Sequence, residues 1–124
     1  MLCIEDNPAN LRLIQHMLSS IEELDIVSAH TASLGLDLAR HKPPDLILMD
    51  INLPGMDGYQ ALEACKSDPV LASIPVVAIT AQAMQSDIER GLAAGFRAYL
   101  TKPLKIQALL QVVESELKIR KNHD

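Results

Sequence analysis

The feature that most constrains the fold is a repeated alternation of short apolar runs with longer stretches of helical periodicity. Apolar runs lie at 1–4, 25–29, 46–49, 76–79 and 98–100, and each precedes a segment in which apolar residues recur every three or four positions. The run at 46–49 is continuous, as is typical of a parallel strand covered on both faces. This order predicts a doubly wound α/β sheet of five parallel strands, with five helices on both faces and right-handed crossovers.

Capping residues indicate where the helices begin and end. Asn7 and Thr31 are predicted N-caps, Pro8 occupies a first turn, and Gly95 is a predicted left-handed C-cap. A third helix is predicted over about 58–66. The apolar stripes of the five helices comprise Leu11, Ile14, Leu18 and Ile21; Leu34, Leu38 and Ala39; Tyr59 and Leu62; Met84, Ile88 and Leu92; and Ile106, Leu109, Leu110, Val113 and Leu117.

Length and charge limit the class of protein. The 124 residues suffice for one domain, 1–124, with a polar tail at 118–124 that is expected to fray. The net charge of −5 and the lack of a dense Lys/Arg run disfavour direct binding to nucleic acid or to an anionic membrane. With no apolar run near the length of a membrane span and no signal-peptide pattern, we expect a cytoplasmic domain. Cys3 and Cys65 lack CxxC spacing and are predicted to be buried thiols.

Polar residues follow four of the predicted strands. Glu5 and Asp6 follow the first, and Asp50 follows the third in "LILMDINLPGMDG". Thr80 follows the fourth strand and Lys102 the fifth. Because the carboxyl ends of parallel strands meet at one edge of a sheet, these side chains are expected to converge there.

The converging residues favour phosphoryl chemistry. Three carboxylates would repel one another without a cation, and an all-oxygen ligand set suits Mg²⁺. A phosphoryl group entering such a site would find a metal, an ammonium group and a hydroxyl, with Asp50 placed to attack phosphorus. Each residue alone also has an ordinary structural explanation, since Asp or Thr after a strand often caps the next helix and Lys is often a solvated surface charge. Their occurrence together favours the functional interpretation.

The chain closely resembles the receiver domain of two-component response regulators. The resemblance is carried by "IEDNPANLRL", "DLILMDINLPGMDG", "IPVVAITA" and "AYLTKPL". It implies a flavodoxin-like sheet of strand order 2-1-3-4-5, in which Asp50 accepts a phosphoryl group from a phosphohistidine. The opening and closing motifs look most like those of receivers attached to hybrid sensor kinases, which relay phosphate onward to a histidine phosphotransfer protein.

The resemblance also assigns the site residues. Asp6, Asp50 and the backbone carbonyl of Asn52 would bind Mg²⁺, for which Mn²⁺ could substitute, and Glu5 would act mostly through water. Lys102 would contact the phosphoryl group. The peptide bond between Lys102 and Pro103 would be cis. The switch residues would be Thr80, which turns toward the phosphoryl group, and Tyr99, which then moves inward and changes the surface of the fourth helix, fifth strand and fifth helix.

Partners follow from the same resemblance. They are a sensor histidine kinase or a histidine phosphotransfer protein, with a parent hybrid kinase as one alternative and a stand-alone regulator as the other. Homodimerisation on phosphorylation is a further expectation, although Arg97 stands where many receivers carry an acidic residue and alters that surface. Asn52 and Gln82 would flank the attacking water and help to set the lifetime of the phosphoryl bond.

Two other functions remain as alternatives. An aspartyl phosphatase would need a second Asp two residues after the nucleophile, and that position is Asn52. A phosphate-independent receiver-like binding module would not need Glu5, Asp6, Thr80 and Lys102 all to be present. The sequence therefore predicts a signalling switch whose chemistry is limited to its own phosphorylation and dephosphorylation, and not a turnover enzyme.

Overall fold

The computed structural model describes residues 1–81 and 84–117 and has the predicted architecture. Five parallel strands form one sheet in the order β2-β1-β3-β4-β5. In chain order the elements are β1 (Leu2–Ile4), α1 (Pro8–Met17), β2 (Val27–Ala29), α2 (Ala32–His41), β3 (Ile47–Asp50), α3 (Gly58–Lys66), β4 (Val76–Thr80), α4 (Gln85–Ala94), β5 (Ala98–Thr101) and α5 (Ile106–Leu117). Within these described ranges, no helix combines the length and the apolar character needed to cross a membrane.

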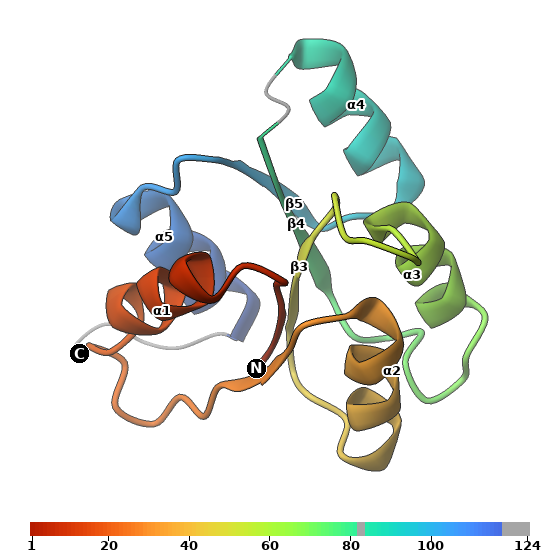
Figure 1. Cartoon of the computed structure of the whole chain (residues 1–124), viewed down its shortest axis with the longest axis horizontal. Coiled ribbons are helices and arrows are strands. Elements are labelled where there is room, and N and C mark those ends of the chain that lie inside the picture. Colours follow the sequence, from red (N-terminus) through yellow and green to blue (C-terminus); the bar gives the residue numbers. More distant parts are fainter. Residues whose placement is uncertain (82–83, 118–124) are drawn as a thin grey trace.

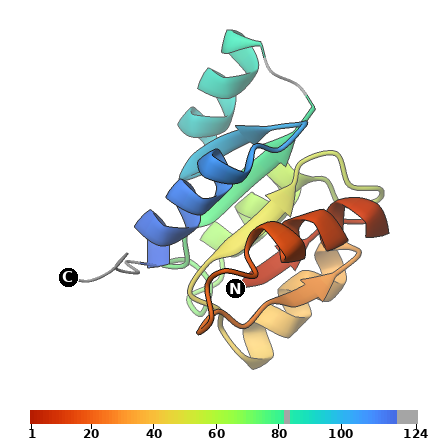
Figure 2. The same cartoon turned by 90° about the vertical axis from the view of Figure 1, so that its left-hand side faces the viewer.

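The helices form a layer on each side of the sheet. Helices α1 and α5 cover one face, and α2, α3 and α4 cover the other (Figure 1). Viewed from the side, α1 and α5 lie in front of the strands (Figure 2). Alternate residues of each central strand enter the two cores: Ile47 and Met49 pack on the side of α2 and α3, while Leu48 packs on the side of α1 and α5. The continuous apolar run of β3 is thus explained by burial on both faces.

Strand register determines which polar residues meet. Ile4 lies opposite Met49, and Asp50 lies opposite Ile79, all at the carboxyl ends of their strands. Glu5 follows Ile4 directly and therefore emerges beside Asp50. At the next step across the sheet, Thr80 lies opposite Thr101. The register thus brings the ends of β1, β3, β4 and β5 to one edge of the sheet.

Caps and turns have the expected chemistry. The side chain of Asn7 accepts hydrogen bonds from two N–H groups of the first turn of α1, and the side chain of Thr31 accepts one from the N–H of Leu34 at the start of α2. Asp57 and Gln60 form a reciprocal capping box at the start of α3. Helix α4 ends at Gly95, whose φ of 119° is the left-handed conformation that favours glycine.

The helical stripes are only partly buried, which corrects the expectation for several residues. In α2 the buried residues are Ala32, Gly35, Leu36 and Ala39, so Leu34 faces outward and is 39% exposed. Leu92 and Ile106 are both 48% exposed. Helix α1 ends at Met17, earlier than its apolar stripe suggested, because Leu18 forms the C-cap and Ile21 lies in the following turn. Both cysteines are buried, and the tail predicted to fray lies outside the described residues.

Candidate functional site

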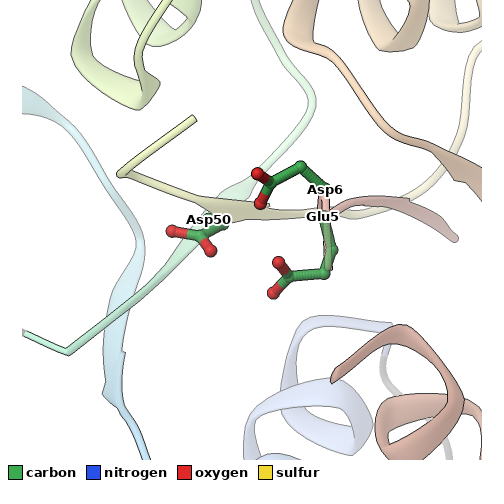
Figure 3. A group of neighbouring side chains, drawn as sticks. All are labelled: Glu5, Asp6 and Asp50. Atoms are coloured by element: carbon green, nitrogen blue, oxygen red, sulfur yellow. The ribbon is translucent and has the colours of Figure 1, made fainter. Parts of the chain in front are cut away.

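Three carboxylates meet at the carboxyl edge of the sheet. Glu5 and Asp6 follow β1, and Asp50 is the last residue of β3. Each offers an oxygen that lies within 4.8 Å of those of the other two, and Figure 3 shows the three side chains in one small region. Glu5 and Asp50 are buried, whereas Asp6 is exposed to solvent. The site is therefore open on one side and closed on the other.

Lys102 brings the compensating positive charge. Its Nζ donates a hydrogen bond of 2.7 Å to Oδ2 of Asp50 and lies 3.4 Å from Oε1 of Glu5. The peptide bond between Lys102 and Pro103 is cis. Burial lowers the pKa of Lys102, but the hydrogen bond and charge of Asp50, followed by the charge of Glu5, raise it overall. The ammonium group therefore stays charged between the two carboxylates.

Glu5 is held in place by the start of the next loop. Its Oε2 accepts a hydrogen bond of 3.1 Å from the N–H of Asn7, while its buried Oε1 has no hydrogen-bond partner. Burial raises the pKa of Glu5, and the charge of Asp50 adds to the rise, while the hydrogen bond from Asn7 opposes it. Oε1 of Glu5 forms an ion pair with Lys102 at 3.4 Å but no hydrogen bond, and a buried carboxylate oxygen next to two more carboxylates is a position that favours a cation.

These residues fit a hard divalent cation. Two oxygens bound to the same Mg²⁺ lie at most about 4.2 Å apart, and the three carboxylate oxygens of this cluster all lie within 4.8 Å of one another. Two carboxylates can therefore bind such an ion directly while the third acts through water or moves slightly. The donor set contains only oxygen, which favours Mg²⁺ or Mn²⁺ over zinc.

Thr80 and Asn52 connect the carboxylate cluster to β5. The backbone N–H of Asn52 donates to Oδ1 of Asp50 at 2.8 Å, and its side-chain Nδ2 donates to Oγ1 of Thr80 at 3.1 Å. Thr80 is fully buried. Burial raises the pKa of Tyr99, the nearby Tyr59 adds to the rise, and a hydrogen bond with Thr80 opposes it. The side chains of Asn52, Thr80 and Tyr99 thus form a continuous polar connection, whereas Gln82 lies outside the described residues.

Arg90 lies beside the site, and no sequence pattern pointed to it. Its guanidinium lies 4.2 Å from the ring centroid of Tyr59, in the geometry of a cation–π contact. Both residues line a cavity of about 640 Å³ together with Asp6, Asn52 and Asp57. Since Tyr59 and Arg90 belong to different helices and are far apart in the chain, no local pattern could have found this pair. A larger cavity of about 880 Å³ lies at the other end of the sheet and contains none of the predicted site residues.

Comparison with known proteins agrees with this geometry. Residues 1–114 match the response regulator receiver domain family. The chain is 36% identical over 116 residues to the polar-differentiation response regulator DivK of Brucella ovis, covering 94% of both proteins. It is 39% identical over 115 residues to the sensor protein GacS of Pseudomonas syringae pv. syringae, covering 90% of this chain but only 13% of GacS.

A solved structure extends the comparison to the site. The receiver domain of the sensor histidine kinase PA1611 from Pseudomonas aeruginosa PAO1 superposes with a TM-score of 0.84 and 33% identity, covering 94% of this chain and 95% of that one. That protein has a magnesium ion coordinated in its active-site cleft. Receiver domains are signalling modules that work with histidine kinases and are not classical enzymes. With the family match spanning most of its length, this chain belongs to the response regulator receiver domains of two-component signalling.

Proposed function

We propose that this domain is a phosphorylation-dependent switch in which Asp50 accepts a phosphoryl group from the phosphohistidine of a kinase or a phosphotransfer protein. The observation that carries the proposal is the pairing of three converging carboxylates with a lysine 2.7 Å from Asp50. Asp6, Asp50 and the backbone carbonyl of Asn52 would hold Mg²⁺, with Glu5 acting through water. The bound ion would supply positive charge for the phosphoryl oxygens.

The chain's own residues account for the transfer step. A carboxylate oxygen of Asp50 forms a bond to phosphorus as the bond from phosphorus to the imidazole nitrogen breaks, and the electron pair stays on that nitrogen. Lys102 would then share its ammonium group with the phosphoryl oxygens, and the hydroxyl of Thr80 would turn toward them. Lys102 and the carboxylates are in place before the donor arrives, and such prior positioning is the main way in which proteins stabilise such a transfer.

The consequence of phosphorylation reaches the surface through Thr80. When the hydroxyl of Thr80 turns toward the phosphoryl group, it would give up its present hydrogen bonds with Asn52 and Tyr99. The side chain of Tyr99 would move in response and change the surface formed by α4, β5 and α5. This surface would then control a partner or the onward relay of phosphate.

The phosphodonor would approach next to α1. Helices α1 and α5 lie side by side (Figure 1), and each exposes an apolar residue, Leu13 at 41% and Ile106 at 48%. Arg12 on α1 is exposed as well. Exposed apolar residues among polar ones suit a transient protein contact, such as that with a histidine kinase or phosphotransfer protein.

The first test is phosphorylation by acetyl phosphate in the presence of Mg²⁺, followed by intact-mass measurement. We expect the addition of one phosphoryl group to the wild-type protein and none to Asp50→Ala. Asp45→Asn is the matched control, because Asp45 precedes the same strand at its opposite end and is exposed. It should gain the phosphoryl group as the wild type does.

The outcomes separate the alternatives. An adduct that depends on Asp50 and on Mg²⁺ supports the switch. An adduct that persists in Asp50→Ala would assign the chemistry to another residue. A folded wild-type protein that neither binds Mg²⁺ nor forms an adduct, even with a phosphohistidine protein as donor, would favour the phosphate-independent binding module.

A further inference from the structure

Gly91 is buried in α4 because the ring of Tyr99 lies against its α-carbon. A Cβ atom built at Gly91 would lie 2.6 Å from Cδ2 and 2.7 Å from Cε2 of Tyr99. Carbon atoms in favourable contact are about 3.5 to 4.0 Å apart, so even a methyl group cannot fit while the ring is there. The glycine thus provides the space that the ring occupies.

The surroundings determine which side would yield to a larger residue. Helix α4 is joined to α3 by two contacts: the guanidinium of Arg90 over Tyr59, and a hydrogen bond of 3.0 Å from Nζ of Lys66 to the carbonyl oxygen of Ala94. Both contacts hold α4 against α3 and oppose its displacement. The ring of Tyr99 is a side chain on the edge strand of the sheet and can rotate toward solvent about χ1.

The position of this ring is linked to the phosphorylation site. Tyr99 is hydrogen-bonded to Thr80, whose Oγ1 also accepts from Asn52. If the ring rotates outward, its hydroxyl leaves Thr80. A change at Gly91 would therefore reach Thr80 through Tyr99 without touching any residue of the carboxylate cluster.

We propose that Gly91 is a positioning residue for Tyr99, because only a glycine at this point of α4 leaves room for the ring where it lies against the helix in this structure. A methyl group there shifts the ring outward and changes the balance of the switch. The meaning of that shift for signalling rests on the proposed function, but the coupling between the two residues does not. Gly91 lowers the helix propensity of α4, and in this proposal its role is to leave space for the ring rather than to make the helix flexible.

Tyrosine fluorescence provides a direct readout. The chain has two tyrosines and no tryptophan, so Tyr59→Phe leaves Tyr99 as the only strong emitter while keeping the ring under Arg90. In this background we expect Gly91→Ala to increase the quenching of Tyr99 by acrylamide, since an outward ring is more accessible. Ala93→Gly is the control, because Ala93 is exposed on the same helix, and it should leave quenching unchanged.

A double-mutant cycle gives an independent readout. In the Tyr99→Ala background there is no ring to oppose a methyl group at position 91. Helix propensity alone then predicts that Gly91→Ala raises the folding equilibrium constant about fivefold. With Tyr99 present, this gain should be lost or reversed. Ala93→Gly should lower the constant about fivefold in both backgrounds, since its side chain meets no ring.

Each outcome decides the proposal. Greater quenching with non-additive stability supports it, as does a Gly91→Ala variant that folds only when combined with Tyr99→Ala. The proposal is overturned if Gly91→Ala leaves quenching unchanged and alters stability equally with Tyr99 and with Tyr99→Ala. It is also overturned if Gly91→Ala prevents folding in both of these backgrounds. The acetyl phosphate assay on the same proteins tests the proposed function separately, because a wild type without an Asp50 adduct overturns that function and leaves the coupling result intact.

Discussion

At the scale of single residues, Asn52 is the position at which the lifetime of a phosphoryl group can be tested most directly. Its backbone N–H donates to Asp50, and its side-chain amide donates to Thr80. An amide at this point can orient an attacking water, and one hydrogen bond is worth about 1 kcal/mol, or about fivefold in rate. We therefore expect Asn52→Met to slow the decay of the Asp50 adduct about fivefold, as followed by intact mass.

Two variants sharpen that measurement. Asn52→Asp introduces the second carboxylate that phosphatases use, and it should shorten the lifetime. Gln111→Leu makes a similar change from polar to apolar on the exposed face of α5 and should have no effect. Equal decay rates for the wild type and Asn52→Met would show that this side chain does not guide the water.

The predicted site residues could be brought together from the sequence because they follow directly from strand ends. Glu5, Asp50 and Thr80 lie within one residue of a strand terminus, so a correct order of parallel strands suffices to place them on one edge. Contacts between helices could not be predicted in this way. The space that Gly91 leaves for Tyr99 depends on how α4 packs over β5, and the sequence alone suggested only a helix weakened by a glycine.

At the scale of secondary-structure elements, α4 is expected to be the least stable helix. The residue it buries is Gly91, so it contributes no fully buried apolar side chain, and its N-cap Met84 provides no side-chain hydrogen bond. The glycine and the missing cap together cost about 2 kcal/mol, which corresponds to roughly thirtyfold faster amide exchange. Hydrogen exchange, followed by mass spectrometry or NMR, should show that the amides of α4 exchange faster than those of α2, which has a Thr31 cap and four buried residues. Amides of α4 that exchange as slowly as those of α2 would contradict it.

The elements themselves were predictable for different reasons. The bounds of α3 match the predicted helix because Asp57 supplies a cap at its start and the apolar period is clear. In α2 the prediction was right for Ala39, which is buried, and for Leu38, which packs against the core, but wrong for Leu34, which is exposed. The buried face also includes small residues such as Ala32 and Gly35. Small residues give little hydrophobic signal, yet they allow a helix to pack closely on the sheet, where a Cβ at Gly35 would collide with Cδ1 of Ile4.

At the scale of the whole molecule, the cation site and the stability of the fold are linked. Three carboxylates held at one edge of the sheet repel one another in the folded chain, and burial already raises the pKa of Glu5. In the unfolded chain these groups are separated and solvated. A cation that binds the folded cluster therefore stabilises the native state alone, by mass action.

We accordingly expect Mg²⁺ to raise the midpoint of thermal unfolding. At a free concentration one hundred times the dissociation constant, the gain is about 2.7 kcal/mol, or roughly 10 °C for a domain of this size. The measurement is calorimetry in MgCl₂ against EDTA, with ionic strength matched by KCl because salt also screens surface charges. Asp6→Asn should abolish most of the shift, whereas Asp45→Asn, at the far end of β3, should retain it. An equal shift in both variants would mean that Mg²⁺ acts through general screening and not through the carboxylate cluster.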